Sequence, residues 1–217
     1  MAQAALFDMD KTLIRVNSAR LFTQFRRDRG EVGSESMLRI SWWLLRYWLG
    51  TLDPTIVAKA VLKDYRHTKE SDMIALCHEW FDGYVKKHIT PKARAAVELH
   101  RSRGDLLIIA SSSTRYAASP LLSELDMHDL VCSELEVENG IFTGEFVNPL
   151  CYGTGKLQMV ERYLKQHGLQ LSEATFYSDS ITDLPLLEAV GTAVVVNPDM
   201  RLLRQAQKRG WPVESWK

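Results

Sequence analysis

The chain has 217 residues, of which 46% are hydrophobic, and it carries 27 basic and 27 acidic side chains. This length and hydrophobic content are enough for one large domain or for a core with a smaller insert, and they exclude global disorder. A formal charge of zero provides no electrostatic footprint for bulk nucleic-acid binding. We therefore expect a globular protein that does not bind nucleic acid.

Two further features of the sequence bear on location. The three cysteines, Cys77, Cys132 and Cys151, are odd in number and widely spaced, which argues against a disulfide framework or a zinc site. The N-terminus lacks a basic region followed by an apolar stretch, and no apolar run reaches the ~18 residues that span a bilayer. We expect a cytoplasmic protein with reduced thiols, no signal peptide and no transmembrane segment.

The first predicted strand, Leu6-Phe7, is short and apolar and leads directly into Asp8. After it the sequence shows only the apolar spacing of helices, up to about Tyr84. Gly30 and Gly50 are typical helix stops for the first two of these helices. The predicted helices cover residues 18–30, 34–50, 53–65 and 69–88.

After residues 89–104, the pattern changes to strands that alternate with helices. Asn139-Gly140 is the strongest signal for a short β-hairpin. The alternation predicts an α/β fold: a doubly wound, Rossmann-like and mainly parallel sheet. The predicted strands cover 105–113, 129–135, 174–180 and 192–198, the hairpin covers 135–147, and the helices cover 155–168 and 183–190.

The all-helical stretch interrupts this sheet just after its first strand. We expect residues 15–91 to form an inserted helical cap domain, and residues 1–14 and 92–217 to form the catalytic core. Pro91 would be the hinge at which the chain returns to the core. In open α/β sheets the chemistry lies beyond the carboxyl ends of the strands, so the cap would be a lid above the site.

Polar side chains stand where three of the predicted strands end. Side chains two apart on an extended chain share one side, so Asp8 and Asp10 would face one pocket. Two carboxylates this close repel unless one is protonated or a cation neutralises them, and hard oxygen ligands of this kind suit Mg²⁺. The three polar segments are Asp8 to Thr12, Ser111 to Ser113, and Ser178 to Asp183.

Each feature also has a structural interpretation when it is taken alone. Asp10 to Thr12 can simply form a turn, the serines can form a loop, and Asp183 can cap a helix. Lys156 in "GTGK" can be a solvent-exposed lysine at a helix start. The segment is not a nucleotide-binding P-loop, because Leu150 and Leu157 stand where that motif needs Gly and Ser or Thr. The coincidence of the polar segments at strand ends is what indicates a site.

Taken in order, four segments resemble the motifs of the haloacid dehalogenase-like superfamily, and most closely its subfamily IB hydrolases, the branch that holds phosphoserine phosphatase-like enzymes. The resemblance runs nearly end to end, because "FTGEF", "DSITDLPLL", "VNPD" and "GWPVESW" share it. The four segments are Asp8-Met9-Asp10-Lys11-Thr12-Leu13, Ser111, Lys156 and Asp179-Ser180-Ile181-Thr182-Asp183.

The resemblance implies a Mg²⁺-dependent phosphatase that hydrolyses a small phosphate monoester through an aspartyl-phosphate. Asp8 would be the nucleophile, and Asp10 would protonate the leaving oxygen and then activate water. Asp8, Asp10 through its backbone carbonyl, and Asp179 would hold the metal, and Asp183 would support the metal or the lysine. The expected phosphate-binding residues are Thr12, Ser111, Ser112 and Lys156, with Ser111 preferred over Ser112 and Ser113.

Several alternatives stay open or are set aside. Asn17 stands where phosphoserine phosphatases carry a substrate-binding glutamate, which weakens that specific activity. A phosphotransferase with the same intermediate and a non-catalytic interaction protein on the same fold remain alternatives. Leu13 replaces the glycine of P-type ion pumps, and Asp10 argues against a dehalogenase. The physiological substrate, the acceptor and the oligomeric state are left open.

The segment "SWWLLRYWLG" crowds Trp42, Trp43, Tyr47 and Trp48 onto one predicted helix. Such a helix is usually buried, so the simplest interpretation is the core of the cap. An apolar substrate pocket and contact with a membrane surface are the functional alternatives. A nearby set of arginines would either attract an anionic substrate or form a solvated helix face. The solvated face is the simpler interpretation. They are Arg15, Arg20, Arg26, Arg27 and Arg29.

Overall fold

The computed structural model describes residues 3–31, 62 and 65–216. The predicted helix at 34–50, with its tryptophans, lies outside the described residues, as does most of the predicted helix at 53–65. Among the described helices, none is long and apolar enough to cross a membrane.

A six-stranded sheet forms the centre of the structure, in the order β3-β2-β1-β6-β7-β8. Every neighbouring pair in this sheet is parallel, which confirms the predicted fold class. β1 is central, and all four of its residues are buried, as expected for a parallel strand covered on both faces. The strands are β1 (Ala4–Phe7), β2 (Leu106–Thr114), β3 (Asp129–Ser133), β6 (Ala174–Ser178), β7 (Thr192–Val196) and β8 (Val213–Glu214).

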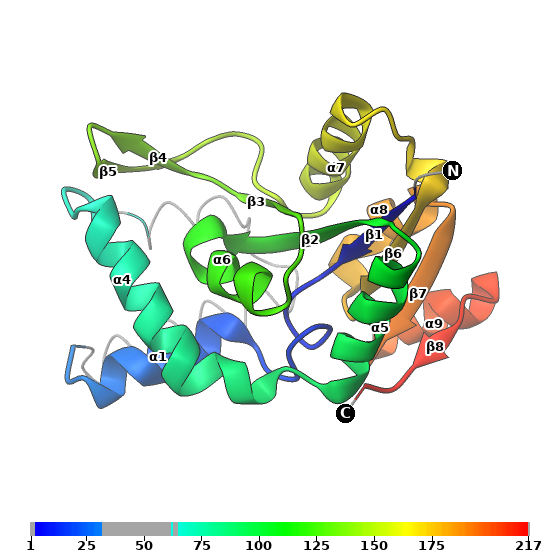
Figure 1. Cartoon of the computed structure of the whole chain (residues 1–217), viewed down its shortest axis with the longest axis horizontal. Coiled ribbons are helices and arrows are strands. Elements are labelled where there is room, and N and C mark those ends of the chain that lie inside the picture. The colour runs from blue at the N-terminus through cyan, green and yellow to red at the C-terminus, as the bar shows by residue number, and fades with distance from the viewer. Residues whose placement is uncertain (1–2, 32–61, 63–64, 217) are drawn as a thin grey trace.

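Helices cover both faces of the sheet, because alternate residues of each strand point to opposite sides. Phe7 faces a cluster that includes residues of α5 (Pro91–Ser102) and α6 (Arg115–Glu124). Leu6 faces a second cluster that includes residues of three other helices. These are α7 (Thr154–Gln166), which lies above the sheet in Figure 1, and α8 (Leu184–Ala189) and α9 (Met200–Arg209), which lie behind it.

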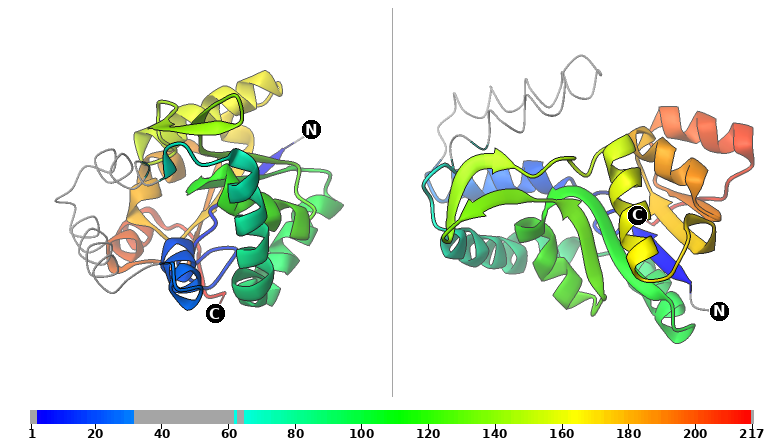
Figure 2. Two further views of the ribbon diagram at one scale, coloured as in Figure 1. Left: turned by 90° about the vertical axis from the view of Figure 1, so that its left-hand side faces the viewer. Right: turned by 90° about the horizontal axis from the view of Figure 1, so that it is seen from above.

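Two described α-helices lie between β1 and α5, namely α1 (Ser18–Asp28) and α4 (Glu70–Trp80). A π-helical turn at Phe81–Val85 and a 3₁₀ turn at Lys86–His88 continue α4. The rings of Phe22 and Trp80 meet edge to face at 5.4 Å, and both views of Figure 2 place α1 beside α4. Trp80 belongs to the same apolar cluster as Phe7, so these helices share a core with the sheet.

The predicted hairpin is confirmed as β4 (Leu135–Glu138) and β5 (Ile141–Phe146), a separate antiparallel pair. Asn139 and Gly140 have φ values of 51° and 75°, the left-handed conformations that a two-residue hairpin turn requires. The hairpin extends from the sheet toward the N-terminal end of α4 (Figure 1), where the backbone N–H of Glu70 donates to the Gly140 carbonyl at 2.9 Å.

Candidate active site

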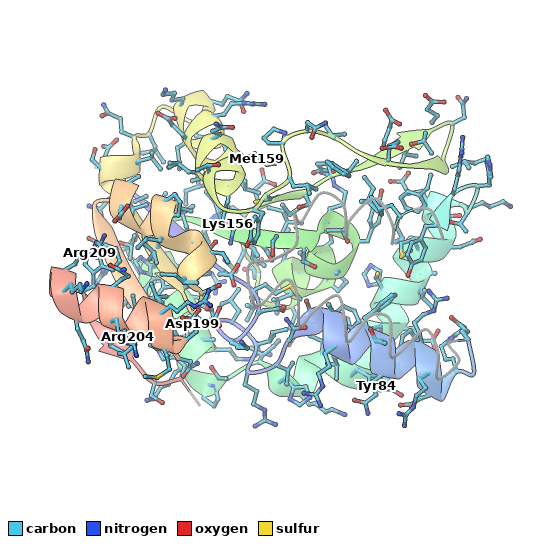
Figure 3. All side chains as sticks on the ribbon, turned by 180° about the vertical axis from the view of Figure 1, so that it is seen from behind. Tyr84, Lys156, Met159, Asp199, Arg204 and Arg209 are labelled. Atoms are coloured by element: carbon cyan, nitrogen blue, oxygen red, sulfur yellow. The ribbon has the colours of Figure 1, made fainter. Side chains whose placement is uncertain are left out.

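A buried ion-pair cluster lies at the carboxyl ends of β1 and β6. Lys156 Nζ is 2.9 Å from Asp8 Oδ1 and 2.7 Å from Asp183 Oδ1. Asp8 directly follows β1, Asp183 follows β6, and Lys156 lies in the first turn of α7, at the centre of Figure 3. All three side chains are buried. The structure therefore joins three residues that are 148 and 27 positions apart in the sequence.

Glycines in "GTGK" let the lysine reach this point. Gly153 has φ 54°, a left-handed conformation that L side chains rarely adopt. A Cβ added at Gly155 would lie 2.2 Å from the Leu150 carbonyl oxygen, so only glycine fits that close approach. The result is a helix start that packs tightly against the preceding turn and directs Lys156 inward.

Asp10 is held at the N-terminus of α1. Its Oδ1 accepts from the Ser18 backbone N–H at 3.0 Å, and its Oδ2 accepts from Asn17 Nδ2 at 2.9 Å and Ser18 Oγ at 3.0 Å. Burial raises the pKa of Asp10 to about 6, and the bonds from Ser18 oppose that rise. A carboxyl with a pKa near neutrality can both donate and accept a proton under ordinary conditions.

Burial also raises the pKa values of two other carboxyls. The pKa of Asp8 rises to about 7, although Lys156 opposes the rise. The pKa of Asp179 rises to about 8, through burial and then through the charge of Asp8. For Lys156 burial acts to lower the pKa, but Asp183 and Asp8 hold it above its ordinary range. The site thus holds more buried negative charge than its lysine neutralises.

This donor set fits a divalent cation. Asp8 and Asp179 are buried carboxylates that destabilise each other's charge, and such oxygen ligands suit Mg²⁺. In the part of the chain that the structure describes, no three His, Cys, Asp or Glu side chains are arranged as a metal centre. Mg²⁺ is compatible with that, because it is usually bound through one or two carboxylates and keeps several waters.

Asp183 and Asp10 already use their carboxylate oxygens within the protein. Asp183 accepts from Lys156 and, through Oδ2, from Ser178 Oγ at 2.7 Å. Asp10 accepts from Asn17 and Ser18. Of the two roles that the sequence leaves open for Asp183, this geometry favours support of the lysine.

The predicted phosphate-binding hydroxyls differ in their surroundings. Ser111 is buried in β2, and its Oγ accepts from the Ser113 backbone N–H at 3.2 Å. Ser112 is exposed, and its carbonyl accepts from Ser133 Oγ at 3.0 Å. Thr12 Oγ1 is buried with no hydrogen-bond partner in the described structure. Buried hydroxyls are normally paired, so a bound group or water is expected at Thr12.

Sequence reasoning missed two residues, Asn197 and Asp199, that fix the loops of the site by hydrogen bonds to their backbone carbonyls. Asn197, just after β7, donates through Nδ2 to the Lys11 carbonyl and accepts at Oδ1 from the Trp216 backbone N–H, both at 2.9 Å. The backbone N–H of Asp199 donates to the Asp179 carbonyl at 3.0 Å, and Asp199 is labelled beside α9 in Figure 3. The segments "VNPD" and "GWPVESW", which contain Asn197, Asp199 and Trp216, resemble the family in sequence, but the resemblance assigned no role to these residues.

A cavity of about 700 Å³ opens at the same edge of the sheet. Asp179 and Lys11 form part of its wall, with Lys11 Nζ 3.6 Å from Asp179 Oδ2. The lining also includes residues at the start of α1 and His88. A small molecule in this cavity can therefore contact Asp179.

The fold and site together are those of a doubly wound, Rossmann-like α/β protein with a buried Asp–Lys–Asp cluster at the carboxyl edge of its parallel sheet. The model of the haloacid dehalogenase-like hydrolases matches residues 5–188. The chain belongs to that family, which confirms the resemblance in the sequence.

Three known proteins illustrate the likeness. The chain is 29% identical over 222 residues to a histidinol-phosphatase of Neisseria meningitidis, with both chains covered in full. It is 28% identical to phosphoserine phosphatase SerB1 of Mycobacterium tuberculosis, covering 100% of this chain and 72% of that one. A crystal structure of a protein of unknown function from Bordetella pertussis matches with a TM-score of 0.92 at 28% identity, over both full chains.

Proposed function

We propose that the protein is a Mg²⁺-dependent phosphatase, a phosphoric monoester hydrolase that acts through an aspartyl-phosphate. The observation that carries the proposal is the buried bridge from Lys156 to both Asp8 and Asp183. A carboxylate can attack a phosphate dianion only if nearby positive charge reduces their repulsion. Lys156 supplies that charge, and relatives with phosphatase names support the same chemistry.

In the first step, a carboxylate oxygen of Asp8 attacks phosphorus, and the bond from phosphorus to the leaving oxygen breaks. Asp10 gives its proton to that oxygen. In the second step, Asp10 takes a proton from water, whose oxygen attacks phosphorus and releases Asp8 and inorganic phosphate. The raised pKa of Asp10 suits both transfers. Lys156 and Ser111 would hold the phosphoryl oxygens throughout.

Asp8, Asp179 and the backbone carbonyl of Asp10 would hold Mg²⁺, which neutralises phosphoryl charge when bound. Asn197 and Asp199 serve this part of the site through the backbone, because they bond to the carbonyls of Lys11 and Asp179. Asp183 would keep Lys156 charged and directed toward Asp8.

The proposal includes a helical cap. Residues 15–91 would form it, and residues 1–14 and 92–217 would form the core. The described parts support this, since α1 and α4 pack on each other and Ser18, the first residue of α1, donates its backbone N–H to Asp10. Such a cap excludes water during reaction and opens for release. The cysteines of the chain are free and buried thiols, so a cytoplasmic location belongs to the same proposal.

Phosphoserine phosphatase activity is a narrower alternative, and the geometry at Asn17 counts against it. The Asn17 side chain donates to Asp10 and accepts from the Arg20 backbone N–H at 3.0 Å. It is therefore committed to the protein at the position where the substrate-binding glutamate of those enzymes would stand.

Release of inorganic phosphate from a panel of monoesters tests the proposal. We expect activity with Mg²⁺, none after exhaustive chelation with EDTA, and recovery when Mg²⁺ is returned. Asp8→Asn is the matched inactive control. Full activity after chelation, or activity in Asp8→Asn equal to wild type, would contradict the proposal. An alcohol acceptor that captures the phosphoryl group in preference to water would identify a phosphotransferase instead.

A further inference from the structure

The cavity beside Asp179 has a basic wall. Its described lining includes three positively charged side chains, Lys11, Arg15 and Arg20, and two acidic ones, Asp179 and Asp199. Lys156 is not among the lining residues. The basic wall is therefore separate from the lysine assigned above to the transferring phosphoryl group.

Neither acidic residue of the cavity neutralises the arginines. Asp199 Oδ1 accepts from the backbone N–H groups of Arg201 and Leu202, and Oδ2 accepts from that of Ile181. Asp179 is paired with Lys11 at 3.6 Å. Within the described residues, no carboxylate lies within ion-pair distance of Arg15 or Arg20. By contrast, Arg26 and Arg29, farther along the chain, both pair with Glu31.

Arg15 is held in place by a neutral partner. Its Nε donates to His88 Nδ1 at 3.0 Å, and its backbone N–H donates to the His88 carbonyl at 3.0 Å. Because the histidine nitrogen must be unprotonated to accept, this contact orients the guanidinium without neutralising it. Arg15 lines the cavity, and among the described residues no hydrogen bond or ion pair involves its two terminal nitrogens. Guanidinium groups bind carboxylate and phosphate through paired hydrogen bonds.

We propose that Arg15 and Arg20 form a subsite for a second anionic group, a carboxylate or a phosphate, on the leaving-alcohol part of the substrate. This rests on the proposed phosphatase function, because the first phosphate is placed at Asp8 and Lys156. The substrate class is then a small phosphate monoester that carries another negative charge. The arginines would bind the substrate equally strongly in the ground state and in the transition state. Their loss should therefore raise KM more than it lowers kcat.

The test compares matched substrates in matched variants. Glycerol 3-phosphate, 3-phosphoglycerate and glycerol 1,3-bisphosphate provide a neutral, a carboxylate and a phosphate arm. For Arg15→Gln combined with Arg20→Gln, we expect kcat/KM to fall about 10–100-fold on the preferred anionic substrate, as for loss of a charge-assisted contact, and less than about threefold on glycerol 3-phosphate. Arg27→Gln is the control, since Arg27 is exposed on α1 and does not line the cavity.

Binding of the same compounds to Asp8→Asn by calorimetry separates this inference from the proposed function. Replacing both arginines should lower the affinity for the compound with the recognised anionic arm by about 10–100-fold. That result supports the subsite even if the protein hydrolyses none of the esters. The subsite would be ruled out if the double replacement lowered affinity and kcat/KM equally for all three compounds, or if it changed neither quantity for any of them. Which arm is affected identifies carboxylate or phosphate as the recognised group.

Discussion

Replacement of Lys156 by Met should destabilise the protein strongly. Lys156 lies 2.9 Å from Asp8 and 2.7 Å from Asp183, and all three side chains are buried. Removing one partner of a buried ion pair leaves uncompensated charge, which costs about 3–5 kcal/mol. For a chain of this size that corresponds to a fall in melting temperature of about 6–20 °C.

The loss of stability in Lys156→Met should also depend on pH when it is measured in EDTA. Without the lysine, the pKa of Asp8 in the folded state rises further above the unfolded value of 3.8. A group with a raised folded pKa stabilises the protein at low pH, and that contribution is lost as pH rises through the folded pKa. The melting temperature of Lys156→Met should therefore fall further below wild type at pH 8 than at pH 5.

Two control variants make this test specific. Lys165→Met removes a largely exposed lysine of the same helix, whose pair with Glu161 spans 3.1 Å, and should change stability by less than about 0.5 kcal/mol. Asp183→Asn in the Lys156→Met background removes one unpaired carboxylate and should recover part of the loss. A melting temperature of Lys156→Met equal to wild type at both pH values would refute this reasoning.

Three further predictions concern the acids and the residues behind them. Asp8→Asn should abolish phosphate release, and Asp10→Asn should slow both steps by roughly 10²–10⁴-fold in single-turnover assays; near-wild-type rates in either would be inconsistent with the roles assigned. Asn197→Ala removes the hydrogen bond to the Lys11 carbonyl and should lower kcat about 10–100-fold by displacing the loop, with KM little changed; a change in KM alone would argue for a substrate contact. Because the folded pKa values of Asp8 and Asp179, about 7 and about 8, exceed 3.8, metal-free protein should lose stability between about pH 4 and pH 8. Melts in EDTA should show that fall, and Mg²⁺ should reverse most of it; a stability that rises over this range would contradict the raised pKa values.

The sequence predicted much of the fold because strand ends and turns are local features. Asn139-Gly140 defines the hairpin, and Asp8 follows an apolar strand that proves to be fully buried. Helix α6 was missed because Pro120 lies inside it, and proline usually ends a helix. Helix α9 was missed although it begins with Asp199 as N-cap and ends at Gly210 in a left-handed conformation.

The contacts that complete the site join residues far apart in the chain, and the sequence alone could not predict them. Asn197 and Lys11 are 186 positions apart, and no periodicity or spacing rule connects them. The orientation of Arg15 likewise depends on His88, 73 positions away. The sequence could suggest that the arginines attract an anionic substrate or form a solvated surface. The cavity favours the first interpretation for Arg15 and Arg20 alone, since Arg26 and Arg29 pair with Glu31.

The most direct test of the central claim is to locate the covalent intermediate. Enzyme quenched during turnover and reduced with borohydride converts an aspartyl-phosphate to homoserine, which tandem mass spectrometry can assign to one position. We predict homoserine at position 8, formed only when substrate and Mg²⁺ are both present. Homoserine at position 10, or its absence at every aspartate during active turnover, would contradict attack by Asp8.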